Sequence, residues 1–336
     1  MMKSGVAKVD QLLADPGAQP IAAGEADAAA VGVVQDLLLG HGFTDLPGVL
    51  GASHGIFGPK TSAAATSFQQ AQGLKATGAV DGPTMAALIA VPATRPIASL
   101  GYLTLVLEIA FLGMTRLMSL TSQFEGAARF TAQNRNHDHA GLSFGLIQWA
   151  QRPGRLTELL AAFQQQQGAA LAAAFGGGDL VTNLLQHCAP PSFGVDSHGQ
   201  TTDPAFDLVN EPWLGRFEAA GLDRDLQRVQ VDLAVSDFQS SFRTLQGYAP
   251  ALASERAVAF MLDLANQFGD AGARHVYEEV SQPGMSEGDL LSAIADESVA
   301  RVRAQFGDGS ETDSTSSRRE AFRTTPLLAD APFAPV

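Results

Sequence analysis

The chain has 336 residues, 46% of them hydrophobic, which is enough to bury the cores of two compact domains and excludes disorder throughout. Acidic residues number 35 and basic residues 21, and the formal net charge of −14 excludes a nucleic-acid-binding role, which needs a clustered basic surface. The same charge excludes binding to an anionic membrane or wall by electrostatic attraction alone. We therefore expect any contact with a glycan to depend on shape and hydrogen bonds.

The N-terminal residues 1–26 are rich in Ala, Gly, Asp and Pro and show no sustained period, so we predict a flexible leader. Residues 1–20 also lack the charged start, the apolar run and the small-residue cleavage site of a secretory signal. We therefore expect the protein to be made in the cytoplasm without a signal peptide.

A compact unit of three helices is predicted over residues 27–92. The first helix carries apolar residues at helical spacing and ends near Gly40. A Gly-rich loop then precedes a second helix with Pro59 in its first turn, and Asp81 or Thr84 is expected to cap the third helix.

The residues of this unit resemble, in their order, the three-helix peptidoglycan-binding module. The resemblance implies that the unit binds the cell wall, and a module retained only as a structural spacer is the alternative. The residues that carry the resemblance are Val34-Gln35, Leu38, Gly55-Ile56-Phe57-Gly58, Thr61, Phe68-Gln69, Gly73-Leu74, Thr77-Gly78, Val80-Asp81, Thr84 and Leu88.

After a short linker at Val91–Ser99, residues 100–306 are predicted to form one mostly helical domain, and the polar residues 307–336 a disordered tail. Between 176 and 210 the abundance of Gly, Pro and Ser indicates a loop region. Further helices are predicted at 155–167, 222–246, 254–268 and 287–305.

The most apolar segment, Leu103–Leu120, contains Glu108 and Arg116. A membrane span needs about 20 largely uncharged residues, so we expect this segment to be part of a long buried helix instead.

Two acidic residues follow that segment in contrasting surroundings. Glu125 comes at the end of the apolar helix, where partial loss of water favours the uncharged form and hence a proton donor. Asp138 lies in a polar loop among Asn and His, where an ionised carboxylate is well solvated. Cleavage of a glycosidic bond needs such a pair, one acid to protonate the leaving oxygen and a second to activate water or attack the sugar.

The segment Gly141–Trp149 resembles the glycine-bearing turn that follows the catalytic Glu in lysozyme-superfamily enzymes. Over about residues 117–165 the pattern is most similar to the chitosanases of glycoside hydrolase family 46. The resemblance implies a mainly α fold, with the small three-helix domain followed by a two-lobed, lysozyme-like helical domain. The residues that match in order are Asp138, Gly141, Ser143, Gly145, Leu146 and Ile147.

This resemblance also assigns roles. It implies that Glu125 is the general acid, that Asp138 is the general base of an inverting reaction, and that Ser143 helps to hold the attacking water. The chitosanases place an acidic residue early in the next helix to bind the amine of glucosamine, whereas Arg155 stands there in this chain. A cation at that position favours the N-acetyl sugars and carboxylates of peptidoglycan. The interval from Glu125 to Asp138 is also shorter than in the family.

Other side chains near this segment are candidates for binding the substrate. His137 and His139 flank Asp138; without a further cluster of ligands they are interpreted as groove-lining or hydrogen-bonding residues, and no metal or cofactor is expected. Gln148 and Trp149 are predicted to contact sugar, with a core aromatic as the equal alternative for Trp149. The remaining candidate is Arg129, and the single cysteine, Cys188, is interpreted as a small buried residue.

The sequence thus favours a muramidase-like peptidoglycan hydrolase that acts on a polysaccharide, without nucleic acid or membrane as partners. A chitosanase, a lytic transglycosylase that uses Glu125 alone, and a non-catalytic wall-binding protein are the alternatives. Because no signal is evident, we expect the protein to reach the wall by phage-type release or through a secretion system. Delivery machinery or an immunity protein would then be further partners.

Overall fold

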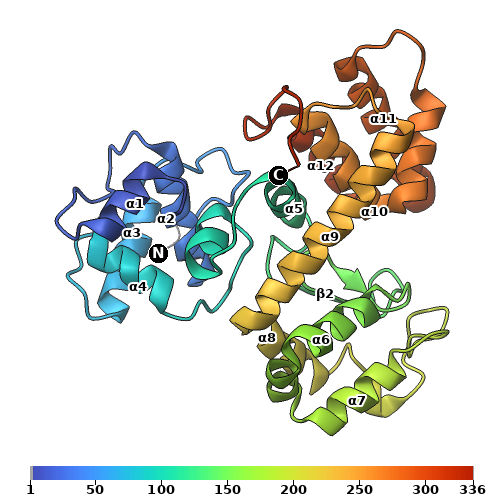
Figure 1. Cartoon of the computed structure of the whole chain (residues 1–336), viewed down its shortest axis with the longest axis horizontal. Coiled ribbons are helices and arrows are strands. Elements are labelled where there is room, and N and C mark those ends of the chain that lie inside the picture. Colours follow the sequence, from blue (N-terminus) through green and yellow to red (C-terminus); the bar gives the residue numbers. More distant parts are fainter. Residues whose placement is uncertain (1–2, 336) are drawn as a thin grey trace. The chain divides into compact units, whose positions relative to one another are not determined.

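The computed structural model describes residues 3–335, and these residues are mainly helical (Figure 1). The prediction of a mainly α chain is confirmed. The chain divides into two compact units, each made of two separate segments: unit 1 contains the residues up to 111 and residues 125–234, and unit 2 contains residues 112–124 and the residues from 235 onward.

The N-terminal part of unit 1 is built from helices α1 (Ala7–Ala14), α2 (Ala28–Gly40), α3 (Pro59–Ala71) and α4 (Gly82–Ala90). The predicted helix starts are present: Pro59 opens α3, and the Asp81 carboxylate caps α4 by accepting a hydrogen bond of 2.9 Å from the Thr84 amide. Two buried glutamines hold the loops between the helices. The Gln35 side chain accepts from the Gly55 amide at 2.8 Å, and Gln69 donates to the Ala79 carbonyl at 2.7 Å.

The expected flexible leader is ordered, which corrects the prediction for residues 1–26 within the part of the chain that is described. Val9 and Leu12 of α1 are buried, and α1 packs against α2 and α4. Ile21 and Val80 exchange two backbone hydrogen bonds, at 2.9 and 2.8 Å. Buried apolar side chains and this backbone pairing therefore attach the leader to the module.

The predicted long apolar helix is interrupted, because its two halves belong to different units. Tyr102–Val106 forms a short π-helix, η1, that is buried in unit 1. The backbone then turns at Glu108, which is exposed and has a φ of 56°. Helix α5 (Gly113–Ser122) follows in unit 2.

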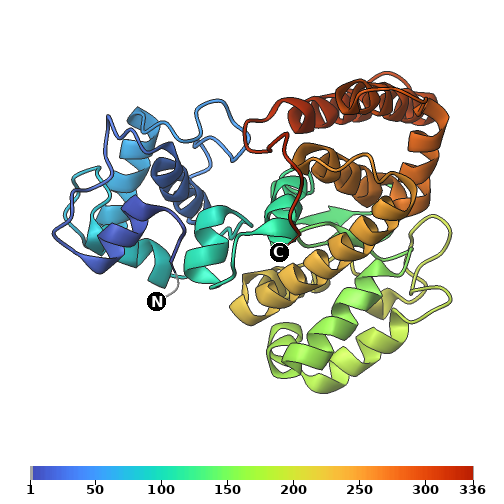
Figure 2. The same cartoon turned by 45° about the horizontal axis from the view of Figure 1, so that its top comes forward.

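The remainder of unit 1 surrounds a small antiparallel sheet. Its strands are β1 (Gln133–Arg135), β2 (Leu142–Phe144) and β3 (Trp149–Ala150), in the order β1-β2-β3. The sheet lies beside the long helix α9 (Figures 1 and 2). The helices of this part are α6 (Arg155–Phe175), α7 (Gly178–His187), α8 (Trp213–Leu222) and the first part of α9 (Arg224–Tyr248).

Aromatic packing joins the sheet to the helices. The Phe217 ring of α8 lies 5.0 Å from the rings of both Phe144 and Phe175, measured between centroids. Helix α7 lies inside the predicted 176–210 loop region, because Val181 and Leu184 supply a buried face in an otherwise polar stretch. Among residues 3–335, no single helix is long and apolar enough to cross a bilayer; α6 and α7 meet that test only jointly, across a bend of 108°.

Unit 2 contains α5, the end of α9, α10 (Glu255–Val280), α11 (Glu287–Phe306) and α12 (Ser310–Thr324). Ser254 and Ser286 cap α10 and α11 close to their predicted starts. The buried Asp263 of α10 pairs with Arg318 at 2.8 Å and with Arg319 at 2.5 Å, both from α12. The expected disordered tail is therefore folded over most of its length, which corrects that prediction.

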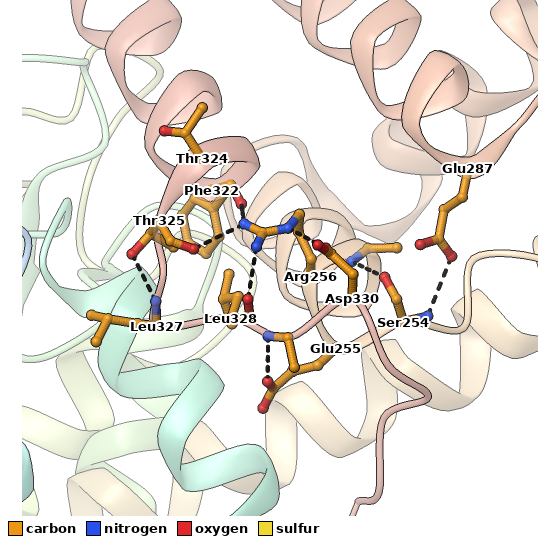
Figure 3. A network of polar contacts seen from close by, with 12 residues as sticks. Ser254, Glu255, Arg256, Glu287, Phe322, Thr324, Thr325, Leu327, Leu328 and Asp330 are labelled. Atoms are coloured by element: carbon orange, nitrogen blue, oxygen red, sulfur yellow. Dashed lines mark hydrogen bonds and ion pairs between the residues drawn. The ribbon is translucent and has the colours of Figure 1, made fainter.

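The Arg256 side chain contacts both the end of α12 and the segment after it (Figure 3). The Arg256 guanidinium donates to the carbonyls of Phe322, Thr325 and Leu328 at 3.1, 3.0 and 2.7 Å, and it pairs with Asp330 at 2.5 Å. One cation thus satisfies the carbonyls at the end of α12 and fixes the chain that leaves it.

Candidate functional site

Two of the three candidate catalytic residues, Asp138 and Ser143, lie on one β-hairpin of unit 1, and Glu125 lies in the turn that leads to it. Glu125 precedes β1, Asp138 lies in the loop between β1 and β2, and Ser143 is the central residue of β2. Ser143 pairs with Asn134 on β1 and with Ala150 on β3, and it is buried. The hairpin therefore fixes Asp138 and Ser143 relative to each other in the chain.

The turn that carries Glu125 has an unusual backbone. Glu125 is half-buried, and the next three residues, Gly126, Ala127 and Ala128, have φ values of 76°, 59° and 57°. A β-carbon on Gly126 would lie 2.4 Å from that of Ala132, so the turn packs directly against the residue before β1. Alanine adopts this left-handed conformation at a cost of about 1–3 kcal/mol, and such strain is concentrated at functional sites.

The loop between β1 and β2 leaves Asp138 exposed, as its polar composition predicts. The Asp138 carboxylate accepts a hydrogen bond from the Ala140 amide at 3.3 Å. The Asn136 side chain accepts from the Gly141 amide at 2.9 Å and so closes the loop. His137 and His139 are also exposed.

A second loop holds the tip of the hairpin in place. Arg152 donates to the carbonyls of His139 and Ser197, at 3.1 and 2.7 Å, and Asn136 donates to the His198 carbonyl at 3.0 Å. Within the second loop, hydrogen bonds from the amides of Gln200 and His198 lower the pKa of Asp196. Asn136 was not predicted as part of the site, because its partner His198 lies 62 residues away in the chain.

The base of the hairpin is held by a buried glutamine of α9. Gln230 donates to the Phe130 carbonyl at 3.1 Å and accepts from the Leu146 amide at 3.1 Å. It therefore joins the segment after Glu125 to the segment after Ser143. Gln227, one turn earlier on α9, is buried in the same way.

Trp149 and Gln148, two of the predicted substrate-binding residues, make structural contacts. Trp149 is 2% exposed, so it is a core residue and not a sugar-stacking platform, which decides between its two alternatives. Gln148 uses its side-chain amide to donate to the carbonyls of Gly145 and Ala132, at 3.0 and 3.3 Å, which corrects its predicted role. Arg155 begins α6 and pairs with Glu158 one turn later.

The two acids lie toward opposite ends of a short strand. β1 has three residues and spans about 10 Å at 3.3–3.4 Å per residue. The Glu125 turn packs at the start of this strand, and the Asp138 loop begins at its end.

No metal-binding group is evident near this pair. Within residues 3–335, no three His, Cys, Asp or Glu side chains are grouped to hold a metal ion. Cys188 is buried, and burial raises the pKa of its thiol to about 12, so it is an inert packing residue.

Comparisons with known proteins concern both parts of the chain. A mutant chitosanase from Bacillus subtilis MY002 complexed with 6 GlcN is similar in structure at 15% identity and a TM-score of 0.46, over 62% of this chain and 86% of that one. The native chitosanase from the same source gives the same values. A further chitosanase complex has 16% identity and a TM-score of 0.43, over 64% and 92% of the two chains.

No curated protein matches the chain. Residues 27–88 match the family model described as a putative peptidoglycan binding domain, which confirms the sequence-based identification of the N-terminal module.

Proposed function

We propose that this protein hydrolyses the glycan strands of peptidoglycan, with Glu125 as general acid and Asp138 as general base. The observation that carries the proposal is the position of the two acids on either side of β1: the Glu125 turn packs against Ala132, which precedes this strand, and Asp138 lies in the loop that follows it. The module at residues 27–88 supports the cell wall as the place of action.

The surroundings of Glu125 and of Asp138 suit the roles that we propose for them. Glu125 is half-buried beside a strained turn, and in the proposed reaction it protonates the bridging oxygen of the glycosidic bond. Asp138 is exposed to solvent, and it removes a proton from a water that attacks the opposite face of the sugar. The space between the carboxylates then accommodates that water, and the configuration at the anomeric carbon inverts.

Ser143 follows both acids along the chain and lies on β2. Its hydroxyl is placed on the central strand, opposite Asn134, and we assign it to holding the attacking water. Arg155 at the start of α6 is proposed to favour the acidic and N-acetylated groups of peptidoglycan over the amines of chitosan.

The test is product analysis of purified peptidoglycan after treatment with the wild type, Glu125→Gln and Asp138→Asn. Each substitution removes acid or base catalysis and is expected to lower the rate about 10²–10⁴-fold, while the wild type releases reducing ends. Glu311→Gln is the matched control, since this exposed carboxylate lies on α12 in unit 2 and should leave the rate unchanged.

Other outcomes select the other functions. Anhydro-sugar ends that depend on Glu125 alone would identify a lytic transglycosylase, and cleavage of chitosan but not peptidoglycan would identify a chitosanase. If the wild type and Glu125→Gln are equally inert on every glycan but both bind sacculi, the protein is a non-catalytic wall-binding protein.

We further propose that the protein acts in the periplasm or outside the cell after phage-type release or delivery by a secretion system. Expression in the cytoplasm is then expected to be harmless, whereas expression with an added export signal is expected to lyse the cell. Equal growth in both cases would contradict this proposal.

A further inference from the structure

The linker between the module and the sheet is an ordered part of unit 1. The Ala98 amide donates to the Ala128 carbonyl at 2.8 Å, and the Phe130 amide donates to the Pro96 carbonyl at 3.2 Å. Ile97 and Arg129 are directly opposite in this antiparallel bridge. The linker therefore lies against the turn that begins at Glu125.

Each of the two paired segments carries an arginine. Arg95, in the linker, and Arg129, in the turn, are both half-buried. Burial lowers the pKa of Arg129, the charge of Arg95 lowers it further, and only Glu218 acts in the opposite direction. The Arg129 Nε donates to the carbonyl of Gly126 at 2.9 Å, so this guanidinium is fixed next to Glu125 in the chain.

Neither guanidinium has an ion-pair partner among residues 3–335, although the whole chain carries 35 acidic residues. The bridge between Ile97 and Arg129 places Arg95 two residues from the partner of Arg129, and two like charges partly removed from water are stabilised by a neighbouring anion. The planar guanidinium fork matches a carboxylate, which accepts two parallel hydrogen bonds.

We propose that Arg95 and Arg129 form a subsite for a carboxylate of the substrate, next to the candidate acid Glu125. Resting on the proposed function, the ligand is an acidic group of peptidoglycan, either the lactyl carboxylate of muramic acid or a carboxylate of the stem peptide. The same subsite repels the ammonium groups of chitosan. It therefore determines specificity and takes no part in bond cleavage.

The experiment measures binding of soluble ligands by calorimetry in the Glu125→Gln background, in which the ligands stay intact. Three ligands are compared: GlcNAc–MurNAc, with a free lactyl carboxylate; GlcNAc–MurNAc-dipeptide, whose acidic group lies in the peptide; and neutral N,N′-diacetylchitobiose. Arg95→Ala and Arg129→Ala are each expected to weaken binding of one acidic disaccharide about tenfold or more, and to leave the neutral one unchanged. The acidic ligand that loses affinity identifies the source of the carboxylate.

Arg243→Ala is the matched control, because this exposed arginine of α9 lies in unit 2 and donates to Gln239 of its own helix. Arg95→Lys and Arg129→Lys keep the charge, and they are expected to retain part of the affinity; they replace the alanine variants if those fail to fold. Unchanged affinity for both acidic ligands in the double variant, or an equal loss for the neutral ligand, overturns the subsite. If the wild type cleaves no glycan but this selectivity is found, the proposed function fails and the subsite stands.

Discussion

Gly145 lies in the turn between β2 and β3, where the hairpin meets α9. Its φ is +82°, and a β-carbon there would lie 2.5 Å from the Gln230 Oε1 and 3.1 Å from the Trp149 ring. Glycine is required for both reasons, since neither the backbone nor the space accommodates a side chain.

Gly145→Ala is therefore expected to lower the free energy of unfolding by about 2–4 kcal/mol, through backbone strain and displacement of Gln230. Thermal and urea denaturation measure the change. Gly288→Ala is the control, since nothing lies within 4 Å of a β-carbon in this first turn of α11, and it should be neutral or stabilising by up to about 1 kcal/mol. Equal stability of the two variants would contradict the role given to Gly145.

Asp36 and His54 form a buried pair in the module, with 2.9 Å between the carboxylate oxygen and the ring nitrogen. Burial raises the pKa of Asp36, even though the hydrogen bond and the charge of His54 oppose it. Burial lowers the pKa of His54, but the hydrogen bond and the charge of Asp36 outweigh this effect, so its net direction is upward. Both groups therefore hold protons more tightly in the folded state than in the unfolded state.

The stabilisation from His54 is fully present below the ordinary histidine pKa of about 6.5 and is lost as the pH rises through the raised value. The raised pKa of Asp36 acts in the same direction. The melting temperature of the wild type is expected to fall from about pH 6.5 upward, whereas His54→Gln should lose that part of the slope. Parallel melting curves for the two proteins between about pH 5 and 9 would refute the assignment.

At the scale of elements, the Arg256 side chain joins the C-terminal segment to α10. Arg256→Ala leaves three carbonyls without their donor and is expected to lower the free energy of unfolding by about 2–4 kcal/mol. Hydrogen exchange should accelerate over residues 325–333. Arg243→Ala, which removes one bond within its own helix, should leave that exchange unchanged. Slow exchange in both variants would show that other contacts hold the segment.

The elements that the sequence predicted well are those with an apolar face and a capping residue. Helices α2, α3 and α4 agree with the prediction, since Pro59 and Asp81 mark two of their starts. Helix α12 was missed because polar pairs hold it: Arg318 and Arg319 are buried against Asp263, and no apolar period marks that contact. A hydropathy pattern does not detect a helix whose buried face is charged.

The candidate site divides in the same way. Glu125, Asp138 and Ser143 could be named as candidates from the sequence because all three lie close together in the chain. Arg95 was not named as a candidate, because it belongs to residues 91–99, which were predicted to be only a short linker. In the structure these residues pair with the turn after Glu125. The burial of Trp149 likewise depends on contacts with distant segments.

At the scale of the whole molecule, the module and the sheet belong to one compact unit. η1 packs against α2 and α4, and the Tyr102 hydroxyl donates to the Gln227 side chain of α9 at 2.9 Å. Arg224 of α9 donates to the Ile89 carbonyl at 3.1 Å. The module is thus a structural part of unit 1 and not only an anchor on a linker.

Leu37→Ala creates a cavity in the core of the module and is expected to cost about 2–5 kcal/mol. Because the module packs against the rest of unit 1, hydrogen exchange should accelerate over residues 133–150 as well as within the module. Residues 287–306 of unit 2 are the internal control and should change least. Acceleration confined to the module would show that it unfolds independently.

The division of the chain between the units also governs its synthesis on the ribosome. Arg116 of α5 pairs with Glu255 at 2.5 Å, and these residues are 139 positions apart. At about 5–20 residues per second, the nascent α5 waits on the order of ten seconds for its partner helix to be translated. During that interval α5 lacks the ion pair that Glu255 provides in the folded protein.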